Sequence, residues 1–503
     1  MILRAGLFCG CCLLALAGCT PPSPDAAPPV LNASGPRVGA PYAVGSRTVF
    51  IHDPSRPYDA VGGVNDGIRT LVTELWYPVD HAEAETGNYR HARYGDYVFG
   101  DREVHRLMMT QTTFFHLTLD SVRPGVSDAQ IDEAIGALFQ RERGSLLDAP
   151  LARIDEALPV VVMSHGDAGS RYNMETLVEH LAAQGYFVIA PEHTGNSPFS
   201  MSGRDPALAK DPAFAASMKG VVPYLSARGT YGETENFGQS DIPFQATDQP
   251  IRFLSNLDRS LMQRINDLRA TIAYLDQLDS LGFAGAEPGF LDLQNLGLVG
   301  RSYGGLTTLV GLALEDRFVS GFAVVSPMVI GLNAQIPADS ELWRSGESVF
   351  FNRDRPTPMQ GLQKPMLLLN GAEDRLIIGF EERLASLTGS AAPSVDQPFP
   401  ALRTVFDRSE APAIWAMLAD THHASLAVSG AYWWPDLKPD RAQRHFQANS
   451  DFRLLNPVVA HEIQKQLAQQ FFDWTLRGDE AALERLSTQP ENTGELSLEL
   501  RNF

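Results

Sequence analysis

The sequence predicts an α/β fold in which a mostly parallel central sheet carries helices on both faces and long cap-like insertions. Short apolar runs that end at a glycine or a polar cluster recur along the chain, and a helix-like segment follows most of them. One run, residues 159–164, is almost continuously apolar and β-branched, which is typical of a strand buried on both faces. Strands that alternate with helices form parallel sheets, because each crossover helix returns the chain to the same end of the sheet.

The expected strands follow this rhythm from the start of the chain. Two opening strands are expected at 48–52 and 70–79, and the second is rich in residues that favour strands. The later strands are expected at 159–164, 187–191, 296–300, 321–326, 365–370 and 413–418.

Helices are expected between these strands. From Leu261 to Leu278 apolar residues recur every three or four positions, which predicts a helix with one buried stripe. Residues 174–183 have the same spacing, and residues 463–474 form another stripe. The segment 303–314 is small and apolar, so it can pack closely on a sheet.

Three long stretches lack this pattern: residues 84–157, 200–255 and 329–361. They are mixed in polarity, and loops of this length in a compact domain are usually functional caps or have structure of their own. We expect these stretches to be insertions around the mouth of the active site. The alternative is that they are peripheral insertions away from the site.

The first residues are typical of an export signal. Arg4 is the only charged residue before an apolar stretch, and small residues then precede Cys19 in the sequence Leu-Ala-Gly-Cys. This ending resembles the bacterial lipobox, in which the cysteine is acylated and becomes the mature N-terminus. We therefore expect a lipoprotein signal peptide at 1–19 with Cys19 lipidated. The protein would then be exported and anchored to a bacterial membrane, on its periplasmic or cell-surface face. An ordinary signal peptide that contains cysteine is the alternative.

The remaining chain divides into three expected parts. Residues 20–46 are rich in Pro and Ala and are expected to form a semi-extended tether. The α/β domain is expected at 47–480, and residues 481–503 are expected to form a C-terminal tail.

Composition excludes several classes of site and partner. All four cysteines lie in the export signal, which excludes disulfides, cysteine metal sites and a cysteine nucleophile in the mature domain. The formal net charge is −20, and no run of Lys or Arg interrupts the acidity. This balance argues against nucleic acid as a partner.

The strongest chemical signal is Gly300-Arg301-Ser302-Tyr303-Gly304, with a further glycine beyond it. The motif follows a strand-like run and opens a small-residue helix, as a nucleophile elbow requires. The turn is so tight that a Cβ at either flanking glycine would clash with a neighbouring strand or helix. Ser302 is therefore the candidate nucleophile.

A serine nucleophile needs a base, and the base needs an acid that orients it. Asp374 follows a buried strand and a glycine turn, which suits the acid. Glu373 is the adjacent competitor and Asp354 a remoter one. The base is expected from the pair His422 and His423, after the strand at 413–418.

Of this pair we prefer His423 as the base, and His422 is the alternative. No metal site is expected there, because adjacent side chains point in different directions and no carboxylate–histidine cluster accompanies them.

The site also needs an oxyanion hole, in which backbone N–H groups face the developing negative charge. One donor is expected from the amide of Tyr303, the residue after the nucleophile. The other is expected from the amide of Asp167, because the His-Gly turn at 165–166 lets the backbone approach a substrate closely. The Asp167 side chain should point away, since its charge would disfavour an oxyanion nearby.

Several sequence blocks resemble the dienelactone-hydrolase-like and platelet-activating-factor-acetylhydrolase-like group of α/β-hydrolases. The resemblance covers roughly residues 45 to 476 and is specific only at its blocks. These are Arg69-Thr-Leu-Val-Thr-Glu-Leu-Trp-Tyr-Pro78, Ser164-His-Gly, the segment 181–196, Arg264-x-x-Asp267 and Gly-Arg-Ser302-Tyr-Gly-Gly. The resemblance implies an α/β-hydrolase fold, hydrolysis of carboxylic esters, and no metal or cofactor.

The group's pattern carries over to Ser302 as nucleophile and to His423 as base. His423-Ala-Ser-Leu is similar to the group's His-aromatic-Ser-Phe ending, although Ala424 replaces the aromatic residue. The acetylhydrolase-like acid position falls near Ser326-Pro327, where this chain has no acid. The resemblance therefore implies the dienelactone-like arrangement, with Asp374 as the acid.

Together these residues predict a serine hydrolase that cleaves small-molecule or lipid-like carboxylic esters through a Ser-His-Asp triad and an acyl-enzyme intermediate. A serine peptidase or amidase would use the same triad, and a non-catalytic binding module could use the same scaffold. Those two functions are the alternatives.

Overall fold

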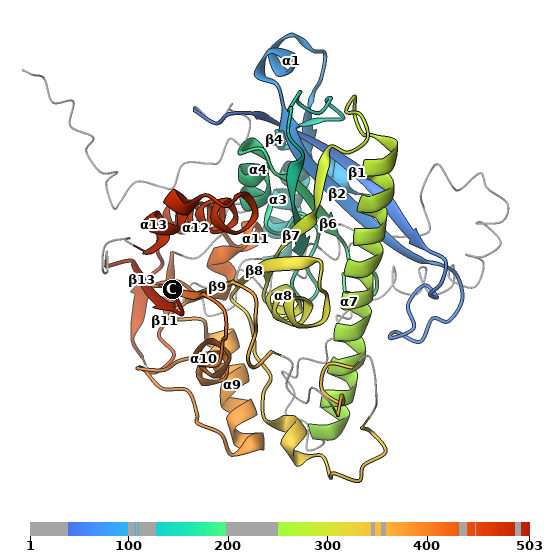
Figure 1. Cartoon of the computed structure of the whole chain (residues 1–503). Coiled ribbons are helices and arrows are strands. Elements are labelled where there is room, and N and C mark those ends of the chain that lie inside the picture. The colour runs from blue at the N-terminus through green and yellow to red at the C-terminus, as the bar shows by residue number, and fades with distance from the viewer. Residues whose placement is uncertain are drawn as a thin grey trace, which may run out of the picture.

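The computed structural model describes residues 39–98, 127–197, 250–343, 348–353, 359–431, 440–447, 449–487 and 494–503, together with Arg106 and Met109 (Figure 1). The export signal, Cys19 and most of the expected tether lie outside these residues. Most of the expected insertion at 200–255 lies outside them too.

Within the described residues, one 11-stranded sheet forms the centre of the molecule, in the order β13-β10-β9-β8-β7-β5-β6-β2-β1-β4-β3. The six neighbouring strands from β10 to β6 are parallel to one another. The strands are β1 (Ala43–Asp53), β2 (Arg69–Val79), β3 (His91–Arg93), β4 (Glu142–Leu147), β5 (Leu158–Ser164), β6 (Phe187–Pro191), β7 (Leu291–Arg301), β8 (Phe318–Val324), β9 (Met366–Gly371), β10 (Ala413–Leu418) and β13 (Leu496–Arg501). Strands β11 (Arg441–Gln443) and β12 (Asp451–Arg453) form a separate pair.

Helices connect and cover the strands. They are α1 (His81–Thr86), α3 (Asp128–Gln140), α4 (Glu175–Ala183), α7 (Pro250–Leu281), α8 (Tyr303–Leu314), α9 (Arg375–Thr388), α10 (Pro400–Asp407), α11 (Val428–Ala431), α12 (Pro457–Arg477) and α13 (Glu480–Ser487).

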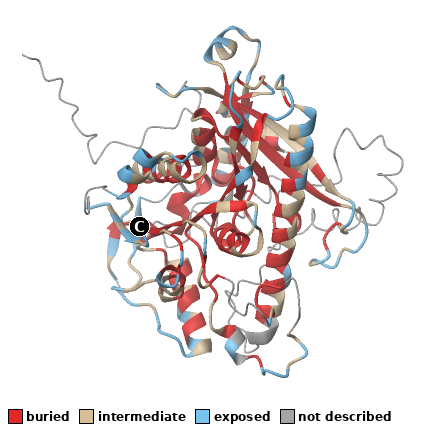
Figure 2. Ribbon diagram, viewed as in Figure 1, coloured by how far each residue is buried: buried red, intermediate tan, exposed pale blue. Residues whose placement is uncertain are grey.

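The two faces of the sheet bury separate apolar cores. Along β5, Val160 and Val162 belong to the core beneath α7, α8, α9 and α10, whereas Val161 and Met163 belong to the core beneath α4 and α12. Figure 1 shows α7 and α12 on opposite sides of the sheet, and Figure 2 shows the central strands buried and the outer helix faces exposed. The predicted α/β class, with helices on both faces of a mostly parallel sheet, is confirmed.

The sheet extends beyond the expected domain at both ends. β1 begins at Ala43, inside the expected tether, and β13 lies in the expected C-terminal tail, where it pairs antiparallel with β10. The described part of the expected insertion at 84–157 contributes β3 and β4 to the sheet. Helix α3 of the same insertion packs against Tyr172 and Val428.

The expected insertion at 329–361 is partly described and packs onto the domain. Asp258 of α7 accepts hydrogen bonds from the backbone N–H groups of Val349 and Phe350, at 2.7 and 2.9 Å. Phe350 and Phe351 are buried in the core. Among the residues that the structure describes, no helix is long and apolar enough to cross a membrane.

Candidate active site

Ser302 lies at the turn between β7 and α8. Its backbone has φ 56° and ψ −122°, a conformation that residues with a Cβ rarely adopt. A Cβ on Gly300 would lie 2.1 Å from the carbonyl oxygen of Gly304, and a Cβ on Gly304 would lie 2.0 Å from that of Ser164. Both distances are far inside van der Waals contact, so the turn requires glycine at both positions.

Three side chains from separate loops meet at this turn. His423 Nε2 lies 3.1 Å from Ser302 Oγ, and His423 Nδ1 lies 2.8 Å from Asp374 Oδ2. All three side chains are buried, and Ser302 is the most accessible at 8% exposure. The structure therefore brings the predicted nucleophile, base and acid into one hydrogen-bonded chain.

Asp374 is held by the start of a helix. It follows β9 and forms the N-cap of α9, where its Oδ1 accepts a hydrogen bond from Ile377 N at 3.1 Å. The second carboxylate oxygen is thereby directed at the histidine. The competitor Glu373 instead forms an ion pair with Arg444. Asp354 lies outside the described residues.

The two adjacent histidines have different surroundings. His422 Nδ1 lies 3.1 Å from Ser425 N and 2.7 Å from Ser425 Oγ, within one local turn. Burial lowers the pKa of His422 to about 4. His422 therefore caps the short turn after β10, and His423 is the one that contacts Ser302.

The electrostatic surroundings of His423 favour its neutral form. Burial lowers the pKa of His423, the Asp374 charge opposes this effect, and the Arg301 charge adds to it. A neutral imidazole with Nδ1–H directed at Asp374 leaves Nε2 as an acceptor for the Ser302 hydroxyl. This is the protonation state that a general base needs before reaction.

Arg301, from the nucleophile motif itself, also contacts the histidine segment. Its Nη2 donates a hydrogen bond to the carbonyl oxygen of His423 at 2.6 Å, and its side chain is buried. Burial lowers the pKa of Arg301 to about 10. The guanidinium therefore joins the nucleophile turn to the loop that carries the histidine.

The two segments expected to supply oxyanion donors adjoin Ser302. Tyr303 is the first residue of α8, where backbone N–H groups have no partner within the helix. A Cβ on Gly166 would lie 3.2 Å from the Cβ of Ser302, so the 165–167 loop borders the nucleophile. The carboxylate of Asp167 accepts a hydrogen bond from Asn196 Nδ2 at 2.6 Å.

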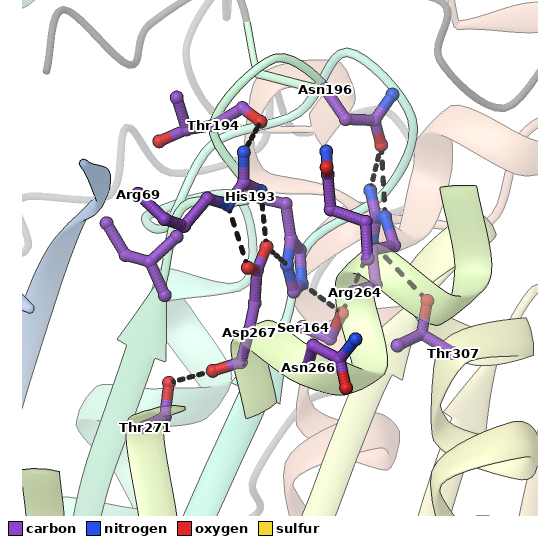
Figure 3. A network of polar contacts seen from close by, with 12 residues as sticks. Arg69, Ser164, His193, Thr194, Asn196, Arg264, Asn266, Asp267, Thr271 and Thr307 are labelled. Carbon is purple, nitrogen blue, oxygen red and sulfur yellow. Dashed lines mark hydrogen bonds and ion pairs between the residues drawn. The ribbon is translucent and has the colours of Figure 1, made fainter. Parts of the chain in front are cut away.

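A second polar network joins Arg69, His193 and Asp267, and the sequence predicts no role for it (Figure 3). Asp267 of α7 accepts two hydrogen bonds from Arg69, at 2.9 and 2.6 Å, and one from His193 Nδ1 at 3.0 Å. Burial raises the pKa of Asp267, but the ion pairs with Arg69 and Arg56 outweigh it and hold the pKa well below its usual range.

The sequence carried a signal for this network. Arg264, Asp267 and Thr271 recur at helical spacing within the predicted helix and border its apolar stripe, where charged residues are seldom buried without partners. All three are buried in the structure.

Among the residues that the structure describes, no group of three or more His, Cys, Asp or Glu side chains could hold a metal ion. The groups at Ser302 are suited to proton transfer and nucleophilic attack.

Comparison with known proteins agrees with this architecture. Among the solved structures that match is a ferulic acid esterase from Streptomyces cinnamoneus, with 17% sequence identity and a TM-score of 0.51, over 93% of this chain and 99% of that chain. The fold is that of an α/β-hydrolase. The family model for platelet-activating factor acetylhydrolase, isoform II, matches residues 138–219, which include β5, the 165–167 loop and His193. A search of curated proteins gives no match.

These matches confirm the predicted resemblance to acetylhydrolase-like α/β-hydrolases. The family model carries the name of an acetylhydrolase and the solved structure that of an esterase. The comparisons therefore support an esterase-like hydrolase in general terms.

Proposed function

We propose that this α/β-hydrolase is a serine esterase that cleaves carboxylic esters through an acyl-enzyme intermediate. The observation that carries the proposal is the continuous chain from Ser302 Oγ to His423 Nε2, and from His423 Nδ1 to Asp374 Oδ2, at 3.1 and 2.8 Å. A binding module that had lost its catalytic function would not be expected to keep three buried side chains in this hydrogen-bonded arrangement.

The reaction has two steps. Ser302 Oγ attacks the ester carbonyl carbon while His423 Nε2 takes the hydroxyl proton, and Asp374 stabilises the imidazolium that forms. The amides of Tyr303 and Asp167 donate hydrogen bonds to the oxyanion. The imidazolium protonates the leaving alcohol, and a water activated by the same histidine then releases the acid.

The test measures release of p-nitrophenol from acetyl, butyryl and octanoyl esters by the mature protein, beside Ser302→Ala. We expect the variant to lose at least about 1,000-fold in kcat, because the acyl-enzyme cannot form. The acyl chain length that the enzyme prefers indicates the size of the pocket that binds the acyl group. If the folded protein hydrolyses no ester and takes no fluorophosphonate label, the enzyme hypothesis fails and the binding-module alternative takes its place.

We also propose that the protein is exported and anchored by lipid on Cys19. The support is the apolar segment and the Leu-Ala-Gly-Cys sequence. Metabolic labelling with a radioactive fatty acid tests it: wild-type protein should carry label, whereas Cys19→Ala should not. Label retained by the variant would refute lipidation at this residue.

A further inference from the structure

Arg264 of α7 contacts the backbone of the loop that borders Ser302. Its Nη1 donates to the carbonyl oxygen of His165 at 2.8 Å, and its Nη2 donates to that of Gly166 at 3.2 Å. The guanidinium also lies over the ring of Tyr303, 4.3 Å from the ring centroid. One buried cation thus touches both segments from which oxyanion donors are expected.

These contacts fix the direction of two peptide groups. In a trans peptide the C=O and the following N–H point in opposite directions. Because Arg264 holds the oxygens of His165 and Gly166 on its own side, the N–H groups of Gly166 and Asp167 point away from the guanidinium. The Gly166 oxygen also accepts from Gly169 N at 3.2 Å, so its peptide has little freedom to rotate.

The imidazole of His165 reinforces the same peptide. Its Nε2 accepts a hydrogen bond from His193 N at 2.9 Å, which requires the ring hydrogen to be on Nδ1. That Nδ1–H lies 2.7 Å from the Gly166 oxygen and donates to it. Burial lowers the pKa of His165 well below its ordinary value, so the ring is neutral. His165 is therefore a structural histidine.

Arg264 is in turn oriented by a directional chain of hydrogen bonds. His193 Nδ1–H donates to the Asp267 carboxylate at 3.0 Å, which leaves His193 Nε2 as an acceptor for the Ser164 hydroxyl at 2.9 Å. The Ser164 oxygen then accepts from Arg264 Nη1 at 3.2 Å. Burial and the Arg264 charge lower the pKa of His193 to about 4, so this order of donors holds at neutral pH.

The chain from Ser164 through His193 to Asp267 has the connectivity of a catalytic triad, but it is sealed from solvent. Ser164 and Asp267 are 0% exposed and His193 is 1% exposed. A substrate carbonyl could not reach the Ser164 oxygen, which also accepts from a guanidinium. The network is therefore suited to holding groups in place.

We propose that Arg264, held by the Asp267–His193–Ser164 chain, is a positioning residue that directs the N–H groups of the 165–167 loop toward the oxyanion formed at Ser302. This inference rests on the proposed esterase function. The guanidinium touches no substrate in this role. Its effect is confined to the hydrogen bonds that the loop donates in the transition state, and substrate binding is affected little.

The experiment compares an oxygen ester with the matched thionoester, in which sulfur replaces the carbonyl oxygen, for wild type, Arg264→Lys and Ser164→Ala. Sulfur accepts hydrogen bonds poorly, so only the oxygen ester benefits fully from oriented donors. Loss of one oxyanion donor lowers kcat by about 100-fold to 1,000-fold, and misdirection of the loop by Arg264→Lys should cost about 100-fold. The ratio of oxygen-ester to thionoester kcat should therefore fall at least about tenfold, with KM little changed.

Ser164→Ala keeps the proposal testable if Arg264→Lys does not fold, and it should lower the ratio in the same direction by about threefold to tenfold. The matched control is Arg143→Lys, which alters a buried arginine that packs on Tyr94 and Tyr97 instead of on the loop. It should lower the melting temperature and leave the ratio unchanged.

The outcomes separate the two proposals. A wild-type protein that hydrolyses neither ester removes the esterase function, and this inference with it. An active wild type whose ratio is unaltered in both network variants overturns the inference alone. A ratio lowered as much by Arg143→Lys would also overturn it, because general loosening would then explain the effect.

Discussion

Replacement of Asp374 by Asn isolates the electrostatic part of the proposed triad. The amide side chain would be nearly isosteric with the carboxylate, and its oxygen could still accept the Ile377 N–H that Asp374 Oδ1 now accepts at 3.1 Å. The helix N-cap and the fold are therefore expected to survive. What changes is the group opposite His423 Nδ1, which becomes a neutral amide that can present N–H in place of a carboxylate oxygen.

The magnitude follows from the geometry. The imidazolium formed during attack places its Nδ1–H against Asp374 Oδ2 at 2.8 Å, with both side chains almost completely buried. At an effective dielectric constant of about 20, two unit charges at this distance attract by about 6 kcal/mol. The amide can restore part of that energy only by turning its oxygen toward Nδ1 and away from the Ile377 N–H, so a loss of about 4–5 kcal/mol, or about 1,000-fold to 10,000-fold in kcat, is expected. An amide N–H facing Nδ1 would also favour the tautomer with hydrogen on Nε2, which cannot accept the Ser302 proton.

The assay is kcat on the best p-nitrophenyl ester, with the melting temperature of each variant measured alongside. Glu373→Gln is the matched control, since this neighbouring acid pairs with Arg444 and should cost less than about threefold. The reasoning is refuted if Asp374→Asn keeps more than a tenth of wild-type kcat, or if Glu373→Gln costs as much.

Three further outcomes are expected at the same site, and the last has a control in helix α3. Because burial lowers the pKa of His423, kcat/KM should stay constant as the pH falls through 6.5. It should decrease only at lower pH, where the imidazole gains a proton, and a pH–rate profile measures this. Arg301→Met removes a charge that lowers this pKa, so the acid limb of the profile should move to higher pH; a limb that stays in place contradicts the assignment. Gly304→Ala puts a methyl 2.0 Å from the Ser164 oxygen and should abolish folding or lower the melting temperature sharply. The control Gly136→Ala adds a methyl that meets nothing within 4 Å in α3. It should raise the free energy of unfolding by about 0.5–1 kcal/mol in a denaturation titration.

The central strands could be predicted because each is a short apolar run with a clear end. β6 and β10 have the expected bounds, and β9 is shifted by one residue at each end. The strands at the two ends of the sheet are not among those that the sequence predicts. β13, Leu-Ser-Leu-Glu-Leu-Arg, does alternate apolar and polar residues with the period of a half-buried strand, but it follows a helical stripe at the end of the expected domain, where the sequence predicts a tail. β3 has only three residues, and β4, Glu-Arg-Gly-Ser-Leu-Leu, opens on two charged residues and a glycine, so neither contains the apolar run that marks the central strands.

The site was predictable where function imposes a local rule. The elbow glycines mark Ser302, and a strand end followed by a glycine turn marks Asp374. The choice between His422 and His423 depends on the φ and ψ of a turn, which spacing alone does not determine. For Arg264 the sequence offers a family-resemblance block and a burial signal but no role, because its partners His165, Gly166 and Asn196 lie on the distant loops after β5 and β6.

The pairing of β13 with β10 also bears on how the chain is made. β10 leads directly into the loop of His423, and its outer backbone groups are satisfied by residues 496–501. A chain whose earlier strands have folded before residues 496–501 pair therefore leaves β10 with one open side, and an open strand of this apolar character readily recruits a strand from another molecule. Deletion of residues 496–501 should therefore first cause the protein to self-associate when it is produced.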